Sequence, residues 1–218
     1  MVSTDKAVRP TNVMGASKRI AELLTQCSNG HFNPTRFMSV RFGNVIGSSG
    51  SVVPLFKRQI EKGGPVTVTH PEVTRYFMTI PEAAQLILQT GSMGEGGEIF
   101  ILNMGSPVKI LDLARDLIRF SGFEPDEDID IKFIGLRPGE KLHEELITDG
   151  EGISPTSHEK ILVLRKEPCD LNWLEVKIEE LVQLAGKQDG PGIKRKLKEI
   201  LPEYEPYQGE LEEKKIGR

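Results

Sequence analysis

The stretch at residues 3–18, STDKAVRPTNVMGASK, constrains this chain more than any other part of its sequence. It places an acid and a base, Asp5 and Lys6, before a turn that contains proline, and the turn leads into a predicted helix with Met14 and Lys18. Residues four apart lie on one face of a helix, so Met14 and Lys18 should face the volume that the acid and the base line. The stretch therefore predicts a folded corner in which a carboxyl group and two ammonium groups lie close together.

Such a corner could carry acid–base chemistry. A lysine accepts a proton near neutral pH only when burial or a nearby cation favours its neutral form, and Lys18 is the candidate neighbour for Lys6. A carboxylic acid donates a proton only when poor solvation favours its protonated form, whereas two adjacent cations favour the ionised form of Asp5. An ordinary exposed ion pair ahead of a helix is the alternative interpretation of these residues alone.

The size and composition of the chain exclude several protein classes. Its 218 residues can form one substantial core, or one domain with a small appendage. With 38% hydrophobic and 28% charged residues, the composition is typical of a folded globular protein. A formal net charge of -4 gives no electrostatic reason to expect nucleic acid or an anionic membrane as a partner. We find no signal peptide and no apolar run long enough to span a bilayer.

The cysteines and histidines predict no metal site. Four histidines and two cysteines, Cys27 and Cys169, show no metal-ligand spacing, and two distant cysteines are no disulfide framework. A zinc-binding HExxH motif that began at His143 would need a histidine where Ile147 stands. A reducing compartment is the default expectation.

Three further motifs follow the corner. The loop at residues 43–52, GNVIGSSGSV, is rich in glycine and serine, which lets backbone N–H groups approach a phosphate. The motif TRYFMT contains Arg75, whose planar fork of donors matches phosphate oxygens. The motif LRPGEKLHEEL offers a cation and a carboxylate, Arg137 and Glu140. Taken singly, a flexible connection and surface charges are the simpler interpretation.

Together and in this order, the four motifs resemble the nucleotide-sugar branch of the extended short-chain dehydrogenase/reductase family. Within that branch, residues 2–165 are most similar to bacterial polysaccharide-biosynthesis enzymes, the UDP-N-acetylglucosamine 4,6-dehydratases. The resemblance implies an α/β fold with the carboxyl-terminal part of a Rossmann-like NAD-binding domain and a smaller α/β substrate-binding lobe. The expected divisions are 1–62 for the Rossmann part with the corner, 63–165 for the interleaved lobe, and 166–218 for a helical extension and tail.

The resemblance also implies roles for the motif residues. Hydride passes from sugar C4 to NAD, Lys6 removes the C5 proton, Asp5 protonates the departing C6 hydroxyl, and the hydride returns to C6. Lys18 holds the nicotinamide ribose. The residues expected to bind the UDP-sugar, through its diphosphate, ribose, sugar or uracil, are Asn44, Ser51, Val52, Val68, Arg75, Arg137 and Glu140.

The chain departs from the family pattern in two ways. Met14 stands where the family usually has a tyrosine, and a thioether cannot take the proton of the C4 hydroxyl. Some members carry methionine there, typically long membrane-anchored ones, and Thr4 before Asp5 fits that type. We therefore expect Asp5, or Thr4 with a bound water, to receive this proton. The second departure is the absence of a glycine-rich dinucleotide fingerprint, and it leads us to expect a longer natural protein whose other half binds most of the NAD.

Two alternatives stay open. A UDP-sugar 4-epimerase shares the hydride step but has no need of an acid–base pair for elimination. The chain could also be a catalytically silent module that binds a sugar nucleotide or self-associates, and we expect these 218 residues alone to be inactive. The full-length protein is expected to be a homo-oligomer in the cytoplasm, or at the cytoplasmic face of an inner membrane that anchors it.

Apolar periodicity and turn residues predict the individual elements. On the helix after Pro81 we expect Ala84 and Leu88 to point inward with their apolar neighbours. The predicted helices are 12–27, 53–61, 81–90, 111–121, 171–184 and 193–201; the strands are 36–42, 66–69, 97–103, 129–134 and 160–164; and 148–158 is predicted as loop.

Overall fold

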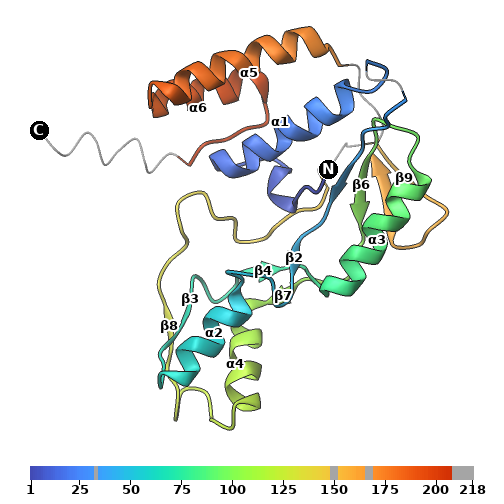
Figure 1. Ribbon diagram of the computed structural model, residues 1–218. Helices are drawn as coiled ribbons and strands as arrows, with labels where there is room; N and C mark the ends of the chain where they lie inside the picture. The colour runs from blue at the N-terminus through green and yellow to red at the C-terminus, as the bar shows by residue number, and fades with distance from the viewer. Residues whose placement is uncertain (32–33, 148–151, 165–168, 208–218) are drawn as a thin grey trace, which may run out of the picture. The chain divides into compact units, whose positions relative to one another are not determined.

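A computed structural model describes residues 1–31, 34–147, 152–164 and 169–207 (Figure 1). The chain forms two compact units, each assembled from segments that are far apart in the sequence. The first unit contains residues 1–42, 86–103 and 145–218, and the second contains 43–85 and 104–144. Residues 208–218 of the predicted polar tail lie outside the described residues.

A mixed four-stranded sheet forms the centre of the first unit. Its order is β1-β6-β10-β9, with β1 parallel to β6 and β10 antiparallel to both of its neighbours. All four residues of β6 are buried, as expected for an inner strand covered on both faces. The bounds are β1 Ser39–Arg41, β6 Ile99–Leu102, β10 Ile161–Leu164 and β9 Ile153–Pro155.

These bounds confirm three predicted strands, which are shorter than expected, and correct one loop. Residues 153–155 were predicted as loop but form β9, because their backbone groups pair with β10 at the sheet edge. Residues 148–151 of that predicted loop lie outside the described residues.

Three α-helices of the first unit pack together. In Figure 1, α5 and α6 lie side by side and both lie against α1. Side-chain oxygens cap all three, as their N-terminal sequences favour. The helices are α1 Val13–Cys27, α5 Leu171–Gly186 and α6 Gly190–Ile200. Their shared core contains Ala16, Ile20, Cys27, Leu171, Leu174, Leu197, Ile200, Leu201 and Tyr204.

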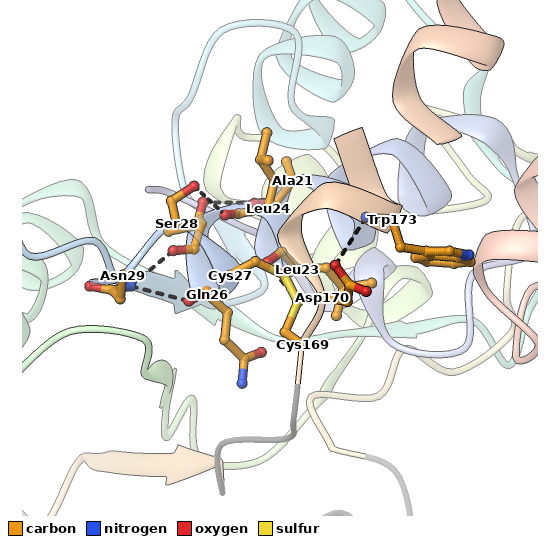
Figure 2. Close-up of a disulfide and its surroundings, with 11 residues drawn as sticks. Ala21, Leu23, Leu24, Gln26, Cys27, Ser28, Asn29, Cys169, Asp170 and Trp173 are labelled. Atoms are coloured by element: carbon orange, nitrogen blue, oxygen red, sulfur yellow. Dashed lines mark hydrogen bonds between the residues drawn. A yellow bond between two sulfur atoms is a disulfide. The ribbon is translucent and has the colours of Figure 1, made fainter. Parts of the chain in front are cut away.

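A disulfide joins the end of α1 to the start of α5 (Figure 2). It links Cys27, the last residue of α1, to Cys169, and the two Cα atoms lie 5.4 Å apart. Asp170 follows and caps α5 by accepting a hydrogen bond from the Trp173 N–H at 3.1 Å. The disulfide corrects the expectation that these two cysteines, 142 residues apart, form no disulfide framework, and packing of α5 on α1 brings them together.

The second unit is built on two helices and three short strand pairs. β3 pairs in parallel with β8, β2 in parallel with β5, and β4 in antiparallel with β7. The predicted loop at 43–52 is therefore partly strand, because Asn44 and Val45 pair with Phe77 and Met78. The helices are α2 Val52–Glu61 and α4 Ile110–Phe120. The strands are β2 Asn44–Val45, β3 Val66–Val68, β4 Thr74–Arg75, β5 Phe77–Met78, β7 Val108–Lys109 and β8 Ile131–Phe133.

Helix α3, Ile80–Met93, is longer than predicted, and two residues that were predicted to point inward from it are exposed. Ala83, Leu86 and Thr90 are buried and mark its inner face at helical spacing. Leu88 is 76% exposed, and Ala84 is also exposed, because both lie outside that stripe. Apolar character alone did not identify the buried face.

Two findings concern the described residues only. No helix in the described ranges has the length and apolar character needed to cross a bilayer. Within the same ranges, no group of three or more histidine, cysteine or acidic side chains is arranged to hold a metal ion.

Candidate active site

The predicted corner forms a short 3-10 helix, η1, Asp5–Ala7, beside the edge of the first unit's sheet. The Ser3 N–H donates to the Val40 carbonyl at 2.7 Å, and the Asp5 N–H donates to the Phe42 carbonyl at 3.1 Å. The residues before η1 therefore run along β1 in strand fashion. Backbone hydrogen bonds from Ser3 and from Asp5 itself thus hold the corner against β1.

Asp5 is buried and in direct contact with both of its neighbours. Its Oδ1 accepts hydrogen bonds from Thr4 Oγ1 at 2.8 Å and from Lys6 Nζ at 2.9 Å. Its Oδ2 is also buried but has no hydrogen-bond partner among the described residues. A buried carboxylate oxygen without a partner is costly, so a group that donated a hydrogen bond to this atom would stabilise the site.

Helix α1 approaches the corner through a glycine. A Cβ atom built at Gly15 would overlap the carbonyl oxygen of Lys6, so only glycine allows this approach. Asn12 caps the helix by accepting a hydrogen bond from the Gly15 N–H at 2.8 Å. Lys18 is on the following turn, and its Nζ donates to the Val2 carbonyl at 3.3 Å. Met14, which precedes Gly15, is about half exposed.

The structure thus brings Thr4, Asp5 and Lys6 into contact and ties Lys18 to the segment that leads into them. The Lys18 side chain is exposed, and a lysine ammonium carries three donors. The role expected for Lys18, holding the nicotinamide ribose of NAD, stays a prediction.

Sequence reasoning missed a buried ion pair behind the corner. Glu22 on α1 and Arg41 on β1 are both 0% exposed, and Glu22 accepts from Arg41 Nη2 at 2.8 Å and Nε at 3.1 Å. Glu22 also accepts from Ser3 Oγ at 2.5 Å and from Arg19 Nη1 at 3.1 Å. The sequence held one signal of this pair: Arg41 is a charged residue inside the predicted buried strand 36–42, and a buried charge needs a partner.

Burial alone would raise the pKa of Glu22. The hydrogen bond and charge of Arg41 outweigh this effect, helped by Arg19 and by the Ser3 hydroxyl, and hold that pKa below its ordinary value of 4.5. The carboxylate is therefore ionised at neutral pH.

In the second unit, two residues predicted to bind the diphosphate and ribose contact each other. Arg75 is 7% exposed, and its Nη2 donates to Glu140 Oε1 at 2.7 Å. Its Nη1 donates to the carbonyls of Thr74 and Leu142, and Glu144 lies 3.8 Å from its Nε. Arg75 is therefore held in a fixed orientation with its charge balanced by carboxylates.

Glu140 also joins this group to the predicted Arg137. Its Oε2 accepts from the backbone N–H of Arg137 at 3.1 Å, and its Oε1 accepts from Thr69 Oγ1 at 3.2 Å. The Arg137 residue is exposed, so its guanidinium is accessible to an anion. Nothing in the sequence singled out Thr69.

The other predicted binding residues have different environments. Asn44 is in β2, where its N–H donates to the Tyr76 carbonyl at 3.0 Å. Ser51 precedes α2, and its Oγ is buried with no hydrogen-bond partner among the described residues, next to the backbone N–H groups of that helix start at Val52. Val68 is 1% exposed in the core, and its carbonyl accepts from the Ile134 N–H. Only the backbone of Val68 could contact a base.

Comparison with known proteins identifies the family. The sequence pattern of the family described as "Polysaccharide biosynthesis protein" matches residues 1–166. The chain belongs to this polysaccharide biosynthesis family. The resemblance found in the sequence motifs is thereby confirmed.

Proteins similar to this chain include a dehydratase and an epimerase. The chain is 56% identical over 188 residues to the capsular polysaccharide biosynthesis protein CapD of Staphylococcus aureus, covering 86% of this chain and 31% of that protein. It is 38% identical over 153 residues to a UDP-N-acetylglucosamine 4,6-dehydratase (inverting) of Campylobacter jejuni, covering 69% and 43%. It is 39% identical over 154 residues to a UDP-glucose 4-epimerase of Rickettsia akari, covering 68% and 42%. The chain thus spans less than half the length of each of these relatives.

Solved structures with Rossmann-like folds superpose on this chain and confirm its α/β fold class. The X-ray structure of Pen from Bacillus thuringiensis superposes with a TM-score of 0.69 at 37% identity, over 78% of this chain and 52% of that chain. A dTDP-glucose 4,6-dehydratase from Bacillus anthracis in complex with NAD gives a TM-score of 0.56 at 15% identity, over 68% and 52%. At 15% identity, the second comparison supports the fold alone.

Proposed function

We propose that this chain carries the acid–base residues and sugar-nucleotide ligands of an NAD-dependent UDP-N-acetylglucosamine 4,6-dehydratase. Such a hydro-lyase makes a UDP-4-keto-6-deoxy-N-acetylhexosamine, a precursor for surface polysaccharide. The observation that carries the proposal is the buried Asp5, which is hydrogen-bonded to Lys6 through one oxygen and offers a second oxygen without a partner in the described structure. Elimination of water requires an acid and a base at adjacent carbons, and this pair supplies both.

The contact between the two side chains suggests how they become active. Movement of one proton from Lys6 Nζ to Asp5 Oδ1, along their 2.9 Å hydrogen bond, converts the ion pair into a neutral amine and a neutral acid. Desolvation by a bound sugar favours the neutral pair, because charges are costly in a site without water. Lys6 can then remove the C5 proton while Asp5 protonates the departing C6 hydroxyl.

The remaining predicted ligands divide between cofactor and substrate. NAD, when bound, supplies the hydride acceptor and donor for C4 and C6, and we assign its ribose contact to Lys18. We assign the diphosphate to Arg75 and Arg137, with Asn44, Ser51 and the start of α2 at Val52 as further contacts.

Glu140 and Val68 complete the proposed substrate contacts. Glu140 would accept the ribose hydroxyls, and the Val68 backbone would border the uracil. Met14 cannot exchange a proton, so the proton of the C4 hydroxyl would leave through Thr4 and a bound water. In the alternative route, ionised Asp5 would take that proton beside a neutral Lys6 and later give it to the departing C6 hydroxyl, in place of the transfer from Lys6. We further propose a homo-oligomer that works in the cytoplasm, or on the cytoplasmic face of a membrane that anchors the full-length protein.

Product analysis of the full-length protein with UDP-N-acetylglucosamine and NAD tests this proposal. The expected product has lost one water and carries a 4-keto group and a C6 methyl group, seen by mass spectrometry and NMR. The Asp5→Asn variant should lose turnover by about 10² to 10⁴-fold, the usual contribution of a positioned acid or base. Turnover within a few-fold of wild type would remove Asp5 from this role.

A UDP-sugar 4-epimerase is the second candidate. The identity of 39% to the Rickettsia akari protein named UDP-glucose 4-epimerase favours it about as strongly as 38% favours the dehydratase. The same assay separates the two functions, because an epimer keeps the mass of its substrate. An epimer as the sole product would replace the dehydratase proposal.

A further inference from the structure

We propose that Glu22 is a positioning residue, which through Ser3 holds the segment carrying Asp5 and Lys6 in place against α1 and β1. The inference rests on the proposed function, since it concerns the geometry in which that acid–base pair works. Glu22 is fully buried and reaches the segment that carries the pair through its hydrogen bond with Ser3.

The contacts of Glu22 reach three separate elements. The residue itself is on α1, one helical turn after Lys18. Its Oε1 accepts from Ser3 Oγ at 2.5 Å and from Arg41 Nε at 3.1 Å, and its Oε2 accepts from Arg41 Nη2 at 2.8 Å. One carboxylate therefore joins the amino-terminal segment, the helix and the first strand of the sheet.

The orientation of this carboxylate is strongly determined. Two of its bonds come from a guanidinium in a bidentate arrangement, which fixes direction as well as distance. Both partners are fully buried, so breaking the pair would leave an uncompensated charge without water. Ser3 is 5% exposed and donates its hydroxyl to an acceptor that is itself fixed.

Ser3 connects the fixed Glu22 carboxylate to the segment that carries the acid–base pair. Its backbone N–H bonds Val40 of β1, while its hydroxyl bonds α1 through Glu22. Thr4 and Asp5 follow directly, and the Thr4 hydroxyl donates to Asp5 Oδ1. A displacement of reacting groups by about 1 Å can cost on the order of 10²-fold in rate, so a tether of this kind matters for turnover.

Two hydroxyl deletions in the full-length protein test the inference. Ser3→Ala removes only the hydrogen bond between the segment and Glu22, and leaves Arg41 paired. Ser39→Ala is the matched control, because Ser39 is 0% exposed and its hydroxyl has no hydrogen-bond partner among the described residues. We expect Ser3→Ala to lower kcat by about tenfold or more with KM changed by less than about twofold, while Ser39→Ala leaves both near wild type.

A second variant keeps the inference testable in the event that Ser3→Ala does not fold. Glu22→Asp keeps the charge beside Arg41 but withdraws the carboxylate by one methylene, and it should lower kcat in the same way as Ser3→Ala. A positioning role is overturned if kcat of Ser3→Ala and Glu22→Asp stays within about twofold of the control, or if both serine variants lose kcat equally. A rise in KM at constant kcat would also overturn it.

The wild-type product keeps this test separate from that of the proposed function. If wild type makes the 4-keto-6-deoxy sugar and Ser3→Ala matches the control, the function stands and the positioning role fails. If wild type makes an epimer and Ser3→Ala still slows that turnover, the dehydratase proposal fails and the positioning role stands.

Discussion

At the scale of single residues, burial decides which charges matter. Arg41 and Glu22 are fully buried and paired, whereas Lys109 and Glu72 form an exposed pair of the kind that contributes little to stability. Removing one partner of a buried pair commonly costs about 3–5 kcal/mol, because the other charge is left without compensation.

The lowered pKa of Glu22 predicts an acid-dependent loss of stability. Its pKa lies below 4.5 in the folded protein, so the unfolded chain binds the proton more tightly and stability rises with pH. This contribution to stability is complete above the pKa of Glu22 in the unfolded chain. It is lost as pH falls from 4.5 through the lower pKa of Glu22 in the folded protein. Chemical denaturation at several pH values should therefore show that the free energy of unfolding decreases as pH is lowered below 4.5.

The control for this prediction removes both charges. A double variant, Glu22→Met with Arg41→Met, replaces the pair with apolar side chains of similar length, a change that is often tolerated. Its free energy of unfolding should depend less steeply on pH below 4.5 than that of wild type. Equal slopes would show that Glu22 is not linked to folding.

Gly15 is the second residue whose identity the structure explains. Its Cβ position coincides with the Lys6 carbonyl oxygen, so Gly15→Ala must push α1 away from the corner. We expect a loss of turnover of on the order of 10²-fold, measured by product formation, because the groups on either side of the contact separate. Gly186→Ala is the control, since a Cβ there meets nothing within 4 Å and should leave turnover unchanged.

The two halves of the candidate site differed in how far they could be predicted. Contact among Thr4, Asp5 and Lys6 follows from adjacency in the chain. The pairing of Arg75 with Glu140 spans 65 residues and could not be predicted from the motifs, although each residue was chosen separately. Their roles as ligands remain predictions.

At the scale of elements, helices were predicted better than strands. Helix starts depend on local caps such as Asn12 and Asp170, which a sequence displays directly. Strands such as β2 and β9 have two or three residues and exist only because a partner pairs with them. Short segments of this kind carry too little periodicity to identify.

The disulfide gives a prediction at this scale. A link between residues 142 apart closes a long loop, and the chain-entropy estimate for such a loop is about 5 kcal/mol as an upper value. Reduction should therefore lower the midpoint of thermal unfolding, with α1 and α5 still packed through their apolar core.

The matched control is the Cys27→Ser, Cys169→Ser double variant. It should unfold at the same temperature with and without reductant, close to the reduced wild type. Thiol titration of the unfolded, unreduced 218-residue chain should find no free thiol. Two free thiols in a chain never exposed to reductant would contradict the link.

At the scale of the whole molecule, residues distant in sequence share one unit. The first unit draws on three segments and the second on two, so the acid–base corner and the Arg75 group are in different units. Motif order along the chain therefore does not reveal which residues fold together. The comparisons add the family, whose relatives named above are at least twice as long as the stretch matched here.

Local features of the sequence by themselves determined most helix bounds and the adjacent acid–base pair, because capping, periodicity and neighbouring residues act over a few positions. The order of the four motifs determined the α/β class through the resemblance to a family. Only the tertiary structure decided which distant groups meet. Packing placed Glu22 against Ser3 and Arg41, and brought Cys27 to Cys169. Such contacts depend on how buried surfaces fit together, and no pattern along a single stretch of chain encodes that fit.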